Sequence, residues 1–308
     1  MKTKEQTRSS SFWPKFKRDR YLYLLLAPGL IFFILFKYIP MWGIIISFQD
    51  YSPYDGVLGS AWVGLDHFKR FFTTDDFYML FRNTMMINLL NLTFFFPMPV
   101  ILALLLNELR SNSYKRVIQS VIYLPHFLSW VIIAGISFLL LSQTGIVNNL
   151  FVIIGLSEYD FLTNSSTFWY LLTAQSIWKD AGWGTIIFLA AIAGVNSELY
   201  EAAKIDGASR LRQAWHITLP AIRGVIIILF ILRLGNIMDV GFEQVFLMMN
   251  GAVSEVADVF DTYTYRIGII GGQFSYSTAI GLFKSIVGLI LVVAANSMAK
   301  RFGEEGVY

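Results

Sequence analysis

The sequence predicts an all-α integral membrane protein with six transmembrane helices and both ends of the chain in the cytoplasm. Of its 308 residues, 56% are hydrophobic and 15% are charged, whereas an ordinary soluble domain carries about a quarter charged residues. The mean hydropathy is +0.57. The apolar residues gather in six stretches, each near the length of about 20 residues that a bilayer requires.

The six predicted spans cover residues 21–47, 84–106, 117–141, 168–194, 222–242 and 278–299. The first contains Pro28 and Pro40 and follows a basic segment. It is much longer than the apolar core of a signal peptide and ends in no cleavage site of small residues. We therefore expect a retained span.

The Lys and Arg residues predict the orientation, because cytoplasmic connections carry the excess of positive charge. Seven lie in residues 1–20, three in the second-to-third connection, four in the fourth-to-fifth connection and two after the sixth span. The opposite connections hold four, and residues 142–167 hold none. Residues 1–20 are thus a basic cytoplasmic tail, and Phe12, Trp13 and the following Tyr21 are expected to be interfacial anchors.

The outer connections predict three features. Residues 66–72 fit a short interfacial helix, and residues 145–156 are apolar but too short to span, so they fit a helix at the outer surface. Residues 251–277 are rich in Gly, Ser and Tyr, which predicts a long loop without structure of its own. A loop of that length is often functional, so it either receives a delivery partner or simply connects two spans.

The connection between the fourth and fifth spans has mixed polarity. A helix over 198–206 places Leu199, Ala202, Ala203 and Asp206 on one side, and Gly207 provides the turn. A second helix starts at Ser209, and the next apolar helix begins near Pro220. By spacing alone, this connection is either an amphipathic segment on the lipid headgroups or a docking element.

The same connection resembles the EAA loop of permease subunits of binding-protein-dependent ABC importers. The family pattern is E-A-A, three residues, G, nine residues and I-x-L-P, and the chain has a match at each fixed position. The resemblance implies a cytoplasmic coupling helix, within 198–220, that docks in the ATPase subunit. The implied coupling residues are Glu201, Ala202, Ala203, Asp206, Gly207, Ala208, Ile217, Leu219 and Pro220.

Other pieces of the chain resemble the carbohydrate-uptake branch of these type I importers. They are Phe36 to Met41, Ser47 to Tyr51, Trp62 to Leu65, Leu105 to Leu109, Tyr123 to Phe127 and Gly241 to Gln244. The resemblance divides the chain into the tail 1–20, a first helix with its outer segment (21–82), a transmembrane core (83–300) and a cytoplasmic C-terminal tail (301–308).

Polar residues inside the spans are candidates for contact with cargo, because charge at the bilayer centre is costly and must face protein or water. We expect Gln175, Trp178 and Trp183 to share a face of the fourth span with Lys179 and Gly182. A helical fifth span likewise aligns four residues: Arg233, Asn236, Asp239 and Glu243. In the sixth span, Gly281, Lys284, Ser285, Gly288 and Ala295 form a small and polar stripe suited to close helix packing.

Two interpretations of these residues remain open. Aromatic rings suit the faces of sugar rings and polar groups suit hydroxyls, which favours a water-filled pathway. Alternatively, Arg233 or Lys284 forms a buried ion pair with Asp239 or Glu243. The cationic residues in the spans also leave room for an acidic sugar.

The resemblance implies a permease subunit, not an enzyme, of a sugar importer in the bacterial cytoplasmic membrane. Its partners would be a second permease, forming a heterodimer or homodimer, two ATPase subunits and an extracytoplasmic binding protein. The chain contains no P-loop sequence and no cysteine, and its three histidines lie far apart. We therefore expect no metal or cofactor on this chain, with ATP and Mg held by the partner ATPase.

Three alternatives differ in class. The same fold could carry an amino acid, a peptide or phosphate. An ion-coupled secondary transporter would show inverted repeats, and the sequence has no convincing repeat. A membrane enzyme would show clustered ligands or an activated nucleophile, and neither is visible.

Overall fold

The computed structural model describes residues 18–301 and 303, and it is almost entirely helical. The basic tail with Phe12 and Trp13, and most of the tail 301–308, lie outside the described residues. Four helical stretches are long and apolar enough to cross a membrane, or six if two bent helix pairs each count as one span. The four are Arg20–Phe48, Asp75–Asn107, Trp130–Ile153 and Phe274–Arg301.

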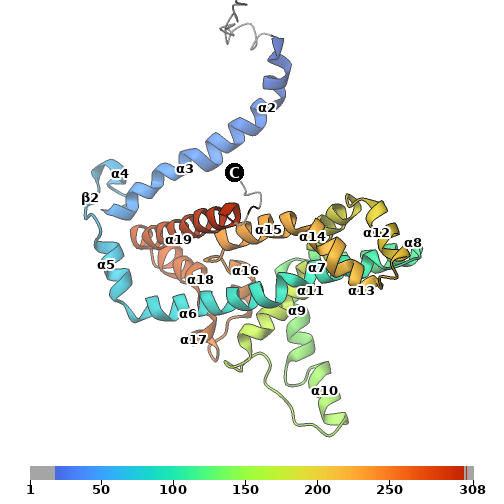
Figure 1. Cartoon of the computed structure of the whole chain (residues 1–308). Helices are drawn as coiled ribbons and strands as arrows, with labels where there is room; N and C mark the ends of the chain where they lie inside the picture. Colours follow the sequence, from blue (N-terminus) through green and yellow to red (C-terminus); the bar gives the residue numbers. More distant parts are fainter. Residues whose placement is uncertain (1–17, 302, 304–308) are drawn as a thin grey trace, which may run out of the picture.

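The first stretch stands apart from the rest of the chain up to Met41, and its last turns contact the stretch Phe274–Arg301 (Figure 1). It runs through α2 (Arg20–Phe33), η1 (Ile34–Tyr38), α3 (Ile39–Met41) and η2 (Trp42–Phe48). No residue of α2, η1 or α3 is buried within the chain. A helix that is apolar all round matches a lipid environment, as expected for the first span.

The outer segment that follows is held by a strand pair and by aromatic packing. Strands β1 (Gln49–Asp50) and β2 (Ala61–Trp62) pair antiparallel, with Gln49 opposite Trp62. Between them lies α4 (Gly56–Gly59), and α5 (Asp66–Thr73) follows, which confirms the short helix predicted over 66–72. Phe71 of α5 is buried against the rings of Phe77, Phe260 and Phe283.

The second span is α6 (Asp75–Leu90), η3 (Asn91–Phe95) and α7 (Pro97–Asn107). The π-helical turn η3 has a clear cause. Proline lacks an N–H and its ring displaces the carbonyl four residues back, so Phe96, just before Pro97, donates instead to the carbonyl of Asn91. The same five-residue bond precedes Pro40 and Pro220.

The predicted third span over 117–141 is wrong as a single helix. Helix α8 (Asn112–Tyr123) gives way to the 3-10 turn η4 (Leu124–Phe127), and α9 (Trp130–Leu141) starts after it. Pro125 opens the break. Because carbonyls freed inside a bilayer need a protein partner, Lys179 from the next span donates to the carbonyls of His126 and Leu128, at 2.9 and 2.6 Å.

Helix α10 (Ile146–Ile153) lies where a short helix was predicted, and α11 (Phe168–Ala193) matches the fourth span. The chain then bends by 75° into α12 (Ser197–Ile205). After α13 (Arg210–Gln213), η5 (Ala214–Thr218) and α14 (Leu219–Ala221), it bends by 62° into α15 (Arg223–Gly235).

The fifth span ends earlier than the predicted residue 242. Helix α15 stops at Gly235, and residues 236–241 form a turn in which Gly241 has a φ of +103°. Helix α16 (Phe242–Met248) starts after this glycine. The face predicted to carry Arg233, Asn236, Asp239 and Glu243 therefore does not exist as one helical stripe.

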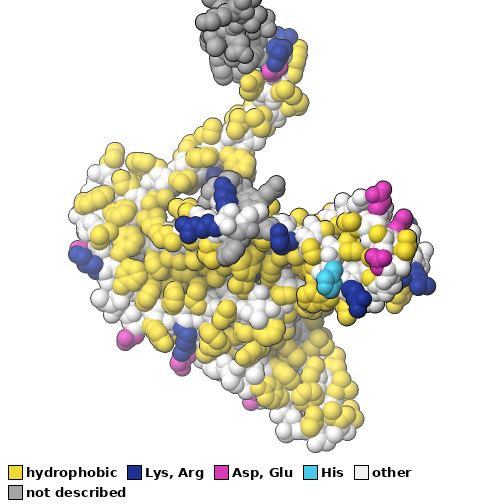
Figure 2. All heavy atoms as spheres, viewed as in Figure 1, with side chains coloured by type: hydrophobic (Ala, Val, Ile, Leu, Met, Phe, Trp, Pro, Cys, Tyr) yellow, Lys and Arg dark blue, Asp and Glu magenta, His cyan; other side chains and the backbone are white. Residues whose placement is uncertain are grey.

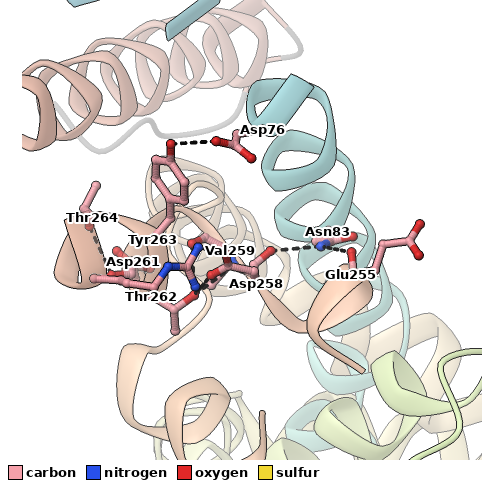
Figure 3. A network of polar contacts seen from close by, with 10 residues as sticks. Asp76, Asn83, Glu255, Asp258, Val259, Asp261, Thr262, Tyr263 and Thr264 are labelled. Atoms are coloured by element: carbon pink, nitrogen blue, oxygen red, sulfur yellow. Dashed lines mark hydrogen bonds and ion pairs between the residues drawn. The ribbon is translucent and has the colours of Figure 1, made fainter. Parts of the chain in front are cut away.

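The outer connection 251–277 was predicted to lack structure, and that prediction is wrong. It forms α17 (Ser254–Ala257), α18 (Phe260–Thr264) and η6 (Tyr265–Ile270). Asn83 of α6 donates to the carbonyls of Glu255 and Asp258, at 2.8 and 2.9 Å (Figure 3). Tyr263 donates to Asp76 at 2.8 Å. The outer connection is therefore ordered by polar contacts to the spanning helix α6.

Helix α19 (Phe274–Arg301) completes the chain. Three apolar clusters hold the bundle together: one between α6, α9, α11 and α16, one between α5, α6, α18 and α19, and one between α7, α11 and the start of α15. Lipid tails are as apolar as these side chains, so close packing rather than water exclusion stabilises the contacts within the membrane.

Replacing Lys179 with Met should destabilise the protein, because the carbonyls of His126 and Leu128 lose their donor. We expect a loss on the order of 1–3 kcal/mol, seen as a lower midpoint of thermal unfolding in detergent. Lys204→Met, at an exposed lysine of α12, is the matched control and should not shift the midpoint. Equal midpoints for both variants would contradict the proposed role of Lys179.

Candidate functional site

The segment 196–221 forms a helical hairpin at one end of the molecule (Figure 1). Asn196 caps α12 by accepting from the N–H of Glu198 at 3.0 Å. At the other end, Gly207 has a φ of +73°. The N–H groups of Gly207 and Ala208 bond back to the carbonyls of Lys204 and Ala203. This is the Schellman ending that glycine favours.

The two halves of the hairpin are fastened to each other. The hydroxyls of Tyr200 and Thr218 lie 2.9 Å apart, and Gln213 donates to the carbonyl of Ala208 at 2.9 Å. Ser209 caps the second half through the N–H of Arg212. The Tyr200–Thr218 contact joins the two sides of the turn at Gly207, whereas the other two bonds stabilise the half that follows the turn.

The hairpin exposes apolar side chains together with charged ones. No residue of α12 is buried, and Ile205, Leu211 and Trp215 are 87%, 70% and 63% exposed. Figure 2 shows acidic, basic and histidine side chains gathered over this end, while much of the visible face is apolar. Exposed apolar residues among charges are typical of a protein-binding surface.

One ion pair ties the hairpin to another span. Arg210 Nη1 lies 2.6 Å from Glu108 Oε2 and 3.1 Å from the Glu108 carbonyl. Glu108 directly follows α7, so Arg210 also satisfies a carbonyl left open at a helix C-terminus. The hairpin therefore contacts the end of the second span in addition to its own two spans.

This ion pair separates two hollows. A polar cleft of about 650 Å³ is lined by residues that include Tyr200, Glu201 and Lys204. An apolar groove of about 640 Å³ lies on the other side, between α7 and the residues Leu211 and Trp215.

The nine predicted coupling residues all lie in this hairpin. Five are exposed and four are half-buried. The exposed residues are Glu201, Ala202, Asp206, Gly207 and Pro220, and the half-buried ones are Ala203, Ala208, Ile217 and Leu219. The N-terminal part of the motif thus faces outward, and the C-terminal part supports the hairpin.

The predicted residues of the fourth span divide into two groups. Gln175 is buried and donates to Ser137 at 2.7 Å, and it accepts from Gln244 at 3.1 Å. It therefore belongs to a packing network between α9, α11 and α16. Trp178 and Trp183 are 47% and 44% exposed, so both offer ring surface outside the chain's own core.

The predicted residues of the fifth span are also dispersed. Arg233 lies over the ring of Phe95, at 5.7 Å from its centroid. Asn236 donates to the carbonyl of Leu232 at 3.2 Å. Asp239 pairs with Lys284 at 2.6 Å, as one of the alternatives predicted, and Glu243 is exposed on α16.

Some polar contacts were missed from the sequence. His126 Nδ1 lies 2.8 Å from Asp180 Oδ1. The His126 ring stacks on the Trp183 ring, with 4.5 Å between the ring centroids and 3° between the ring planes. His126 and Asp180 are 54 positions apart, so their spacing in the sequence does not indicate that they meet. The available hints were an aspartate within an apolar span and a histidine directly after Pro125.

Residues 18–301 contain no group of three or more His, Asp or Glu side chains placed to hold a metal ion.

Comparison with known proteins gives a consistent result. The family model described as "Binding-protein-dependent transport system inner membrane component" matches residues 96–304. The chain is 56% identical to the polygalacturonan/rhamnogalacturonan transport system permease protein YteP of Bacillus subtilis, over 96% of this chain and 92% of that protein. It is 28% identical to the arabinooligosaccharides transport system permease protein AraP of the same organism, over 92% and 90% of the two chains.

A solved structure is also similar. It is the crystal structure of a bacterial alginate ABC transporter in complex with an alginate pentasaccharide-bound periplasmic protein. The similarity has a TM-score of 0.88 at 41% identity and covers 96% of this chain and 99% of that chain.

Reversing the charge of Arg210 should loosen the hairpin from α7. Because both side chains are about half exposed, the pair contributes about 0.2–1 kcal/mol. We expect amide hydrogen exchange in residues 197–213 to rise roughly two- to fivefold in Arg210→Glu. The double variant Glu108→Arg with Arg210→Glu should recover most of the protection.

The control is Arg212→Glu, which makes the same charge change two residues away on the exposed side of α13. Its exchange should match the unaltered protein. If Arg210→Glu exchanged no faster than Arg212→Glu, the ion pair would not anchor the hairpin.

Proposed function

Because the chain belongs to the family of binding-protein-dependent transport system inner membrane components, we propose that it is the permease subunit of a carbohydrate ABC importer. In this proposal the hairpin 196–221 receives the ATPase subunit, and the spans form part of the path for an oligosaccharide. The observation that carries the proposal is the hairpin itself, with the motif residue Glu201 presented outward on a helix that buries no residue.

The hairpin is suited to transmit motion. It connects α11 to α15 directly, through bends of 75° and 62°. The Tyr200–Thr218 contact joins its two halves, and Arg210 joins it to α7. A push on α12 from two closing ATPase domains would thus reach three spans together and shift the bundle between inward-open and outward-open states. Such a shift needs ATP to bind one state better than the other.

We propose six spans with both ends of the chain in the cytoplasm. Counting each bent pair as one span supports the number six. The excess of Lys and Arg in the tail and in the hairpin supports the orientation. This topology places the hairpin on the side where an ATPase is accessible, in the cytoplasmic membrane of a bacterium.

We propose an acidic oligosaccharide as the cargo. The relatives named for polygalacturonan and for alginate share 56% and 41% identity with this chain. Galacturonan is a polymer of uronic acids, and alginate is named as an acidic polysaccharide. These names favour carbohydrate over amino acid, peptide or phosphate.

The proposed partners follow from the role of a permease subunit, which forms the transport path while other subunits hydrolyse ATP and deliver the sugar. A second, homologous permease completes the path, with a heterodimer as the preferred arrangement, and two ATPase subunits bind ATP and Mg. An extracytoplasmic binding protein delivers the sugar to the outer side.

The variants Glu201→Lys and Gly207→Pro should leave the subunit in the membrane but uncouple it. A proline at 207 cannot take a φ of +73° because its ring holds φ near −65°. We would measure both variants in the assembled transporter in proteoliposomes. Stimulation of ATP hydrolysis by sugar-loaded binding protein should fall at least about tenfold, and uptake of a galacturonate trisaccharide should fall by a similar factor.

The control is Glu158→Lys, the same charge change at an exposed residue of the connection between α10 and α11. It should keep full stimulation. If Glu201→Lys and Gly207→Pro behaved like Glu158→Lys, the hairpin would not be the coupling element. Uptake by this chain alone, driven by an ion gradient, would instead favour a secondary transporter.

A further inference from the structure

The small and polar stripe of α19 divides into two parts with different surroundings. At Gly288, an added Cβ would lie 2.5 Å from the carbonyl oxygen of Gly235, so α15 packs directly on this glycine. At Gly281, two turns earlier, nothing lies within 4 Å of an added Cβ. One part of the stripe is therefore a helix contact, and the other part faces open space.

That open space is a shallow cavity of about 440 Å³ between α16, α18, η6 and α19, and it is largely open to the outside of the chain. This volume is within the usual range for small-molecule sites, about 300–1,000 Å³. Its lining includes Phe242, Asp261, Tyr265, Thr278, Gly281 and Lys284. Asp261 and Tyr265 come from the outer connection 251–277, which was predicted to lack structure.

The charged side of the cavity is a triad. Lys284 is only 11% exposed at its side chain, and its Nζ contacts carboxylate oxygens of both Asp239 and Asp261. An ammonium group has three N–H donors, so two are used by these carboxylates and one remains. With one cation and two anions the triad has a net charge of −1, which disfavours a carboxylate ligand and favours hydroxyl groups.

The lining of the cavity is also aromatic. The rings of Phe242 and Tyr265 lie 5.0 Å apart at 57°, and Phe246 stacks on Phe242 at 5.1 Å. The neighbouring rings hold Phe242 in place while it lines the cavity. The hydroxyl of Thr278 donates to the Phe274 carbonyl at 2.7 Å, which leaves its lone pairs as acceptors.

A sugar ring carries both of the matching surfaces: a C–H face that packs on aromatic rings and hydroxyl groups that donate to carboxylates and accept from an ammonium. We infer that this cavity is a subsite for one sugar ring of the transported oligosaccharide. It binds the ring face and hydroxyls, and the uronate carboxylate points away from the triad. This inference rests on the proposed function and locates a cargo contact outside the residues predicted from the fourth and fifth spans.

Gly281→Leu tests the inference, because an added Cβ at this position meets nothing within 4 Å and the larger side chain would occupy the subsite. In the assembled transporter, we expect uptake of a galacturonate trisaccharide to fall at least about tenfold. Stimulation of ATP hydrolysis by the loaded binding protein should stay within about twofold, since the hairpin is untouched. Gly29→Leu in α2, where an added Cβ also meets nothing within 4 Å, is the control and should transport normally.

Thr278→Val provides a second variant that removes one hydroxyl and keeps the side-chain shape. We expect uptake to fall about threefold, by the same factor for the trisaccharide and for its methyl ester. A loss confined to the free acid would mean that the cavity binds the carboxylate, which would overturn the assignment.

The outcomes separate the two proposals. If the unaltered transporter imports the trisaccharide and Gly281→Leu imports it equally well, the subsite is wrong and the proposed function stands. If the unaltered transporter, with its ATPase and binding protein, imports no such oligosaccharide, the proposed function fails and the subsite fails with it.

Discussion

Backbone groups inside a bilayer have no water to bond, so each interruption of a helix needs a substitute partner from the protein. This constraint explains much of the structure. Before Pro40, Pro97 and Pro220 the chain widens by one residue into a π-turn, and the carbonyl five residues back accepts the bond. At the larger break after α8, the substitute partner is the ammonium group of Lys179, which donates to the carbonyls of His126 and Leu128. A lysine inside an apolar span thus stabilises the helix break of its neighbour.

The interruptions are also the places where the chain has the two surfaces for which we propose functions. The break at Gly207 makes the hairpin, and the break over 236–241 directs Asp239 toward Lys284 and starts α16 in a new direction. A continuous helix could have made neither feature. The packed helices form the scaffold, and glycines and prolines determine where the helices are interrupted.

The hairpin and the α19 cavity lie at the two ends of the same span. Helix α15 follows the hairpin directly, and the turn after its C-terminus carries Asp239, which bonds to Lys284. Any tilt of α15 therefore acts on the charged side of the cavity. Gly235 and Gly288 allow the close backbone contact on which α15 and α19 would move relative to each other. This arrangement joins the hairpin proposed to receive an ATPase to the cavity inferred to bind a sugar ring.

The sequence by itself determined the membrane class, the positions of most spans, the α5 and α10 helices and the hairpin with its turn at Gly207. These features depend on local hydropathy, on glycine and proline, and on one contiguous motif. Only the tertiary structure decided the break near Pro125, the early end of α15, the order of residues 251–277 and the meeting of Asp239 and Asp261 with Lys284. The physical reason is that three of these depend on polar partners far away in the chain: Lys179 for the break, Asn83 and Asp76 for the outer connection, and three separate elements for the triad.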